Sequence, residues 1–216
     1  MTMPPGSVVL LALVVLATPA CANRKSEPTG SSQSTSTSTS TSAEAAAPER
    51  GVIECMSIEA PAGSSKAGGV GGGLSFRGKK QLRSGTVAYD PSFTVTTQAA
   101  EGANLEAVRD ELLASFTKDY SAVMRTASRT GGLQPSDLQP PRVTPAPVAG
   151  LPGHAWQIDS IASFNGERLP WRAYSMSTIF RDRVYVVTAA AALSNIGELK
   201  PTADRYFATI RFDACK

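Results

Sequence analysis

Hydrophobic positions follow three different patterns along the chain, and each pattern predicts a different kind of segment. Residues 7–17 are almost uniformly apolar, residues 31–42 are nearly all Ser and Thr, and from residue 52 onward short apolar runs alternate with polar positions. The first pattern is typical of a membrane-directed leader, the second of a spacer and the third of a folded domain. The chain therefore divides into a leader over 1–21, a disordered tether over 22–50 and one globular domain over 51–216.

The alternation within the globular part predicts an antiparallel sheet. Strands are expected at 52–58, 74–77, 86–89, 93–97, 155–161, 171–180 and 184–190. The pair Asp90-Pro91 is interpreted as a turn that splits 86–97 into two strands. Asn165-Gly166 and Arg181-Asp182-Arg183 are interpreted as the turns of a three-strand meander, because polar tips between β-rich runs indicate hairpins.

Two helices complete the predicted domain. The first follows Asn104, a good N-cap, and repeats apolar residues on one face at Leu105, Val108, Leu112, Phe116 and Val123. The second opens at Pro201-Thr202 and places Tyr206, Phe207 and Ile210 at helical spacing. The Pro- and Gly-rich stretch 130–152 is expected to be a surface loop. Strands with packed helices predict an α+β fold.

The apolar leader ends in Thr18-Pro19-Ala20-Cys21. It is too short to span a bilayer comfortably and matches the hydrophobic region of a secretory signal. A small residue directly before Cys resembles the lipobox of bacterial lipoproteins, which implies a diacylglycerol on the sulfur of Cys21 and cleavage before it. Thr18 and Pro19 depart from that pattern, and the leader carries no Lys or Arg before its apolar run.

Two other outcomes stay open for the leader. Ala20-Cys21-Ala22 also fits the A-x-A rule of ordinary signal peptidase, and cleavage there would release a secreted protein that begins at Asn23. An uncleaved anchor is the remaining alternative. Several acyl chains hold a protein on a membrane stably, whereas one chain binds only marginally. The lipoprotein interpretation therefore predicts a membrane-anchored protein of the cell envelope, on its periplasmic or surface side.

The chain has three cysteines, Cys21, Cys55 and Cys215. Acylation of Cys21 would leave the other two as a pair at opposite ends of the globular domain, where chain termini are often close in space. Export to an oxidising compartment permits a disulfide between them. A metal site is not expected, because no cysteine has a partner at ligand spacing and His154 is the one histidine.

The order of these elements resembles a known family. The helix at 105–124, the segment Leu151-Pro152-Gly153-His154-Ala155, the long meander and the closing Ile210-Arg211-Phe212 are similar to the PsbP-like α/β/α sandwich. That family includes the photosystem II extrinsic protein and the DcrB-type and LpqN-type bacterial lipoproteins. The resemblance covers residues 74–212, and the segment 52–73 departs from it. It implies a non-enzymatic module for binding or assembly and brings no catalytic residues.

Composition excludes some partners and leaves others open. The net charge is +3, from 21 basic and 18 acidic residues dispersed along the chain, which does not favour nucleic acid. The one basic cluster is interpreted as a solvated hairpin, with anionic lipid headgroups or an acidic partner as the alternative. It consists of Arg77, Lys79, Lys80 and Arg83.

Few residues suggest catalysis. The Gly-rich run 67–73 lacks the Lys-Ser/Thr of a phosphate loop and is interpreted as a mobile loop. A hydrolase needs a nucleophile with a base, and His154, interpreted as an ordinary strand-edge residue, is the one imidazole available. The carboxylates Asp159, Glu167, Asp182 and Glu198 show no pairing in the sequence. Trp156 and Trp171 are interpreted as core or sheet-face residues.

These observations lead to one functional hypothesis and its alternatives. The preferred hypothesis is a lipid-anchored envelope protein whose domain is a non-catalytic binding module, with an envelope protein as partner and no cofactor. A soluble secreted carrier that holds a small apolar ligand between helix and sheet is the second. A hydrolase that uses His154 is the third.

Overall fold

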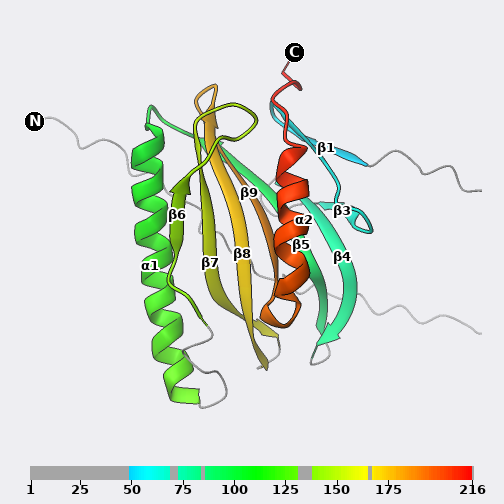
Figure 1. Ribbon diagram of the computed structural model, residues 1–216, viewed down its shortest axis with the longest axis vertical. Helices are drawn as coiled ribbons and strands as arrows, with labels where there is room; N and C mark the ends of the chain where they lie inside the picture. Colours follow the sequence, from blue (N-terminus) through cyan, green and yellow to red (C-terminus); the bar gives the residue numbers. More distant parts are fainter. Residues whose placement is uncertain (1–48, 69–72, 84–85, 131–137, 165–166, 216) are drawn as a thin grey trace, which may run out of the picture.

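The computed structural model describes residues 49–68, 73–83, 86–130, 138–164 and 167–215, which form one seven-stranded antiparallel sheet, a separate two-stranded hairpin and two long helices (Figure 1). The strands of the large sheet lie in the order β3-β4-β5-β9-β8-β7-β6. They are β3 (Ser65–Gly68), β4 (Leu74–Arg83), β5 (Thr86–Ala99), β6 (Arg142–Pro145), β7 (Gly153–Phe164), β8 (Glu167–Phe180) and β9 (Arg183–Ala192). The expected α+β class, with helices packed on an antiparallel sheet, is confirmed.

The helices α1 (Leu105–Thr130) and α2 (Ile196–Ala208) pack on opposite faces of this sheet. Alternation along the central strand β9 shows why: Tyr185, Val187 and Ala189 join the core under α2, whereas Val184 and Ala190 join the core under α1. Side chains on a strand point alternately to its two faces, so a strand that is apolar at both parities can be buried on both. Figure 1 shows α2 crossing in front of the central strands and α1 alongside β6 and β7.

Aromatic side chains fill both layers between helix and sheet. Under α2, the ring of Tyr206 meets Phe93 at 5.1 Å and Phe76 at 6.2 Å, both edge to face. Under α1, Phe116 meets Trp156 at 5.8 Å in the same manner. Trp156 and Trp171 are 3% and 4% exposed, which confirms that both belong to the core.

The helix α1 begins where its cap predicts. The Asn104 side chain accepts a hydrogen bond from the backbone N–H of Ala107 at 2.8 Å, and the Asn104 carbonyl accepts the first helical bond from Val108 at 3.1 Å. Val108, Leu112 and Phe116 are buried on one face, as the apolar spacing indicates.

The first expected strand, 52–58, is wrong in detail. It is a hairpin of β1 (Arg50–Ile53) and β2 (Met56–Glu59), with its turn at Glu54-Cys55. The sharp reversal has Glu54 at φ 51°. β1 packs against β4 and β2 packs against α2, and Met56 and Ile58 are fully buried. The apolar positions of this hairpin have the spacing expected for one longer strand, so the sequence pattern does not reveal the turn.

Asp90-Pro91 is not a turn, because β5 runs unbroken through both residues. Gly78 on β4 lies opposite Pro91, and a Cβ at Gly78 would lie 2.7 Å from the Pro91 ring. The ladder between β5 and β9 begins only at Ser92, so the missing N–H of Pro91 removes no bond from it. A glycine in the neighbouring strand therefore makes room for the proline.

The last helix does not open at Pro201, which lies inside α2. It begins at Ile196, five residues earlier, directly after a 3₁₀ turn over Leu193–Asn195. Leu199 is 2% exposed and extends the buried stripe of Ala203 and Tyr206. Packing of this additional turn on the sheet outweighs the unfavourable proline.

Several predictions fall outside the described residues. These are the leader with Cys21, the tether up to residue 48 and positions 69–72 of the Gly-rich run, although Ala67 and Gly68 belong to β3. In the part of the chain that the structure covers, no helix is long and apolar enough to cross a membrane.

Candidate functional site

The stretch 130–152, expected to be a loop, contains an ordered hairpin. Beyond β6 the chain continues as a narrow ladder, in which Ala146 N–H donates to Gly153 and Val148 and Leu151 exchange hydrogen bonds at 2.9 and 3.0 Å. Ala149 and Gly150 form the two-residue turn with φ of 49° and 84°, the pattern of a type I′ turn. We call residues 145–153 the proline hairpin, because Pro145, Pro147 and Pro152 lie in it. Its order was missed because prolines mark loops more often than strands.

The base of the proline hairpin packs against the sheet through a close approach between backbone atoms at Gly153. A Cβ at Gly153 would lie 2.6 Å from the carbonyl oxygen of Ser177 and 2.9 Å from that of Ala146. The Thr178 hydroxyl donates to the carbonyl of Pro152 at 2.7 Å. Glycine is therefore required where β7 begins, and β8 fixes the base of the hairpin.

A cavity of about 390 Å³, open to solvent, lies between the proline hairpin and the first turn of α1. Its volume falls within the range of small-ligand sites, about 300–1,000 Å³, but it is a shallow surface hollow rather than an enclosed pocket. Its walls are mostly apolar, and they include Leu105, Pro145, Pro147 and Leu151. Two ionisable side chains also line it, Glu106 and His154.

His154 is not the ordinary strand-edge residue that the sequence suggested, because it is only 2% exposed. Its Nε2 lies 3.6 Å from Oε1 of Glu106, and its ring is 6.3 Å from that of Trp156. Its buried Nδ1 has no hydrogen-bond partner among the described residues. A buried polar atom without a partner is destabilising, so this position is a candidate for function.

Glu106 is the exposed member of this pair. Its side chain is 60% exposed and also forms an ion pair with Arg109, one turn further along α1. Hydrogen bonding to Asp110, with a contribution from Glu106, raises the pKa of Arg109 above its usual value. Glu106 thus links the surface charges of α1 to the buried imidazole.

The described lining of the cavity combines apolar side chains with two ionisable groups. Of the described residues that line it, none carries a hydroxyl or a thiol. Across the same described part of the chain, no three His, Cys, Asp or Glu side chains lie close enough to hold a metal ion. What remains is an apolar surface with one carboxylate at its rim and one imidazole beneath it.

A second polar cluster, on β7 and β8, was missed in the sequence. Asp159, whose side chain is fully buried, accepts two hydrogen bonds from Arg172 at 2.7 Å each. It also accepts the backbone N–H of Gln139 at 2.7 Å, which fixes the segment that leads into β6. The hydrogen bonds that Arg172 donates to Asp159 raise the pKa of Arg172 above its usual value. The signal was available, because Asp159 and Arg172 are equidistant from the turn predicted at Asn165-Gly166 and face each other in the register.

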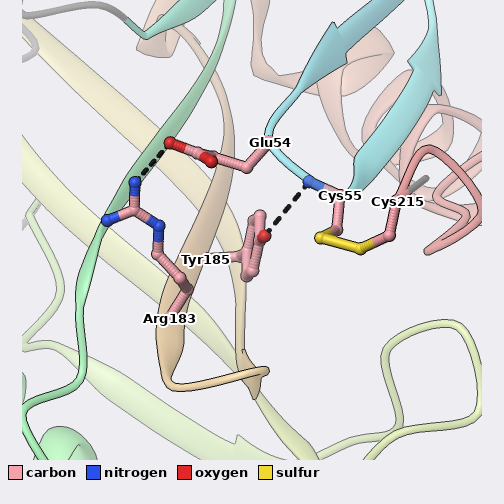
Figure 2. Close-up of a disulfide and its surroundings, with 5 residues drawn as sticks. All are labelled: Glu54, Cys55, Arg183, Tyr185 and Cys215. Atoms are coloured by element: carbon pink, nitrogen blue, oxygen red, sulfur yellow. Dashed lines mark hydrogen bonds and ion pairs between the residues drawn. A yellow bond between two sulfur atoms is a disulfide. The ribbon is translucent and has the colours of Figure 1, made fainter.

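Cys55 and Cys215 form a disulfide, with their Cα atoms 4.4 Å apart (Figure 2). The Tyr185 hydroxyl accepts the backbone N–H of Cys55 at 3.4 Å, and Glu54 forms an ion pair with Arg183. These contacts join the β1–β2 turn and the C-terminal tail to the start of β9. The disulfide is structural and lies outside the cavity lining.

The basic cluster lies along β4, and it does not line the cavity. Arg77 is half-buried near the middle of the strand. The side chains of Lys79, Lys80 and Arg83 are outside the described ones, so the solvated hairpin stays a prediction and contact with lipid headgroups or an acidic partner stays its alternative.

No family model matches the chain, and no curated protein matches it. A solved structure of a protein from Bacteroides thetaiotaomicron is similar to it with a TM-score of 0.43 and 10% identity, over 78% of this chain and 49% of that one. The chain thus spans about half the length of that protein.

Two further solved structures are similar. LpqN of Mycobacterium tuberculosis, described as involved in cell envelope biogenesis, gives a TM-score of 0.40 and 11% identity over 77% of this chain and 86% of its own. The Ran-binding protein Mog1p of Saccharomyces cerevisiae gives 0.42 and 9% over 77% and 97%. At these values the similarity concerns the fold and carries no conclusion about function.

Proposed function

We propose that the protein is an exported, membrane-tethered binding module of the cell envelope, and that the cavity beside the proline hairpin is its binding site. The observation that carries the proposal is the buried His154, which lines a cavity of ligand size and faces Glu106. The disulfide supports export, because such bonds persist in oxidising compartments. The binding is proposed to be non-catalytic, since the described cavity residues offer no hydroxyl or thiol nucleophile.

The proposed anchor is an acylated Cys21. The Ser/Thr-rich tether is proposed to be a flexible coil, and its 29 residues would then hold the domain about 30 Å from the membrane on average. Changing Cys21→Ala should move the protein from the membrane fraction to the soluble fraction of the envelope. Mass spectrometry of the mature N-terminus separates the alternatives, because cleavage after Ala22 leaves an unmodified Asn23.

The carrier alternative fits the geometry less well. Side chains fill both layers between helix and sheet, where Tyr206, Phe93 and Phe116 meet other rings. The cavity lies instead beside the hairpin at the end of β7. A carrier should appear with bound mass in native mass spectrometry, whereas the binding module should appear at its own mass.

Site-directed photo-crosslinking tests the binding site in the native envelope. A photoreactive amino acid replaces Pro147, which lines the cavity and is exposed, and in a matched control it replaces Asp204, which is exposed on α2. We expect one envelope component to crosslink at position 147 and not at 204. Equal crosslinking at both positions, or none at 147, would contradict the proposal.

A further inference from the structure

Positive charge in the folded domain is concentrated at one edge of the large sheet. Residues 65–99, which include β3, β4 and β5, contain five basic residues and one acidic residue, a net charge of +4. The whole chain carries +3, so the rest of the sequence is nearly neutral. We call the five basic positions the basic edge, and they are Lys66 on β3 and Arg77, Lys79, Lys80 and Arg83 on β4.

The strand register places most of these positions where the sheet has no neighbouring strand. β3 is the outermost strand, and it pairs only with the first four residues of β4. Beyond them, the outer side of β4 has no partner strand among the described residues, and Lys79, Lys80 and Arg83 belong to this free part. The acidic residue of the region, Asp90, is opposite Lys79 in the ladder with β5.

The segment that comes from the leader joins the domain at this same edge. The carboxylate of Glu49, the first described residue, accepts the backbone N–H of Lys66 on β3 at 3.4 Å. The carbonyl of Glu49 accepts the backbone N–H of Ala60 at 2.6 Å, which fixes the start of β1 beside it. A domain held to a membrane through this segment therefore has the basic edge close to its point of attachment.

The opposite edge of the sheet carries the proposed partner site. β6 is at the other end of the strand order, and the proline hairpin continues from it. Figure 1 shows β6 on the side of α1 and β4 on the far side of the sheet. A membrane in contact with the basic edge would thus leave the proline hairpin directed away from the lipid and open to a partner.

An anionic bilayer matches both the charge and the place of the basic edge. Lys and Arg residues near a membrane are attracted to anionic headgroups, and the attraction falls off within about 8 Å at physiological ionic strength. At the mean distance of about 30 Å that the tether would set, these charges are screened from the lipid. A flexible tether nevertheless lets the domain approach the surface repeatedly, so contact depends on the charges at the attached edge.

We infer that the basic edge binds the anionic lipid surface of the membrane to which the protein is tethered. This inference rests on the proposed function, because the tether keeps the domain near that membrane. The contact is peripheral and electrostatic, so salt releases it, whereas salt does not release acyl chains on Cys21.

Vesicle binding tests the inference without the anchor. The full mature chain from residue 21, with Cys21→Ala, is mixed with vesicles of phosphatidylcholine alone or with vesicles in which one third of the lipid is phosphatidylglycerol. We expect binding to the second kind only, and we expect high salt to abolish it. Absence of binding to the phosphatidylglycerol vesicles would overturn the inference, and the lysines would then only protect a free edge from pairing.

Matched charge variants locate the contact. Both triple variants below remove the same net charge, and the control residues are exposed on α1 and α2. We expect the affinity for phosphatidylglycerol vesicles to fall at least tenfold in the first variant and to stay unchanged in the control. Equal losses in the two would show that only net charge matters and would overturn the inference. The first variant combines Lys79→Gln, Lys80→Gln and Arg83→Gln, and the control combines Lys118→Gln, Arg125→Gln and Arg205→Gln.

A variant that adds charge keeps the test valid if the triple variant folds poorly. Gln81 lies between the basic positions on the free part of β4. Gln81→Lys should tighten vesicle binding by about fivefold. Unchanged or weaker binding of a folded Gln81→Lys protein would also contradict the inference.

The inference and the proposed function fail in different ways. If the vesicles do not bind while mass spectrometry finds an acylated Cys21, the basic edge is wrong and the tether holds. If the vesicles bind but the mature chain begins at an unmodified Asn23, the tether is wrong and the lipid contact holds. Fractionation of the Cys21→Ala protein in high salt keeps the two apart, because it releases the peripheral contact.

Discussion

At the scale of single residues, the hydrogen-bond partners of a few polar groups determine whether each group stabilises or destabilises the fold. Both carboxylate oxygens of Asp159 accept hydrogen bonds, whereas the hydroxyl of Tyr206 has no hydrogen-bond partner among the described residues. Asp213 lies on the surface and accepts a short hydrogen bond from Ser57. Substitution of Asp159 should lower the unfolding free energy and substitution of Tyr206 should raise it, whereas Asp213 should make it depend on pH.

Removal of Asp159 should be strongly destabilising. Asp159→Ala leaves Arg172, whose side chain is 13% exposed, without its partner. Breaking such a buried pair costs about 3–5 kcal/mol of unfolding free energy. Urea denaturation measures it, with Asp204→Ala, which breaks the exposed pair with Lys200, as a control near zero. A loss below 1 kcal/mol for Asp159→Ala would show that the pair is not buried as described.

Removal of the Tyr206 hydroxyl should stabilise the domain. Burial raises the pKa of Tyr206, so the phenol stays neutral and its unpaired O–H only adds a desolvation cost. Tyr206→Phe should raise the unfolding free energy by about 1 kcal/mol. Tyr185→Phe is the matched control, because that hydroxyl accepts a bond from Cys55 and its loss should lower stability. The same sign for both variants would be evidence against this account.

The C-terminal tail should loosen in acid. The hydrogen bond from Ser57 at 2.6 Å, with Arg50 and Arg211 nearby, lowers the pKa of Asp213 below its ordinary value of 3.8. A carboxyl with a lowered folded pKa stabilises the fold above its unfolded pKa, and that contribution is lost as the pH falls through the folded pKa. In a carbon-13 titration, Ser57→Ala should raise the pKa of Asp213 and Ser75→Ala should leave it in place.

At the scale of elements, the sequence predicts correctly those helices and strands whose boundaries are fixed by residues close together in the chain. The meander and α1 follow from alternation, the turn predicted at Asn165-Gly166 and the Asn104 cap. The β1–β2 turn, the strand through Pro91 and the early start of α2 depend instead on distant partners. Gly78 makes room for Pro91, and burial of Leu199 extends α2. The cavity was not predicted for the same reason, since α1 and the proline hairpin meet only in the folded chain.

The start of β7 gives a prediction at this scale. Gly153→Ala would place a Cβ against two backbone carbonyls that have little freedom to shift, so we expect a loss of about 1–3 kcal/mol. Gly197→Ala is the matched control, because a Cβ there meets nothing within 4 Å and alanine favours the helix by about 0.5–1 kcal/mol. Thermal unfolding should show a lower melting temperature for Gly153→Ala and not for Gly197→Ala, and equal shifts in the two variants would contradict this prediction.

At the scale of the whole molecule, the two ends of the domain are joined. Beside the disulfide, Ser57 and Arg211 exchange backbone hydrogen bonds, and Ala214 N–H donates to Cys55. The aromatic ring of Phe212 packs against Phe180 and Tyr185. The tail is thus part of the core under α2 rather than an appendage.

Loss of the disulfide should weaken this closure. Replacing both cysteines, Cys55→Ala with Cys215→Ala, should lower the unfolding free energy by about 2–5 kcal/mol. Chemical denaturation measures the change, and reduction of the unaltered protein should reproduce it. Non-reducing peptide maps of exported protein should contain the linked peptides, and two free thiols there would contradict the pairing.

The bond between Cys55 and Cys215 also determines how the domain would carry mechanical load. A pull on the N-terminal segment reaches Cys55 soon after β1, and a partner held at the proline hairpin would resist at residues 145–153. Between these points the chain is a closed ring with two arms, one running from Cys55 to the hairpin and the other returning from Cys215. Force would divide between both arms, so the domain could lengthen only by unravelling them together. In the proposed arrangement, this ring would resist stretching between the tether and a partner bound at the hairpin.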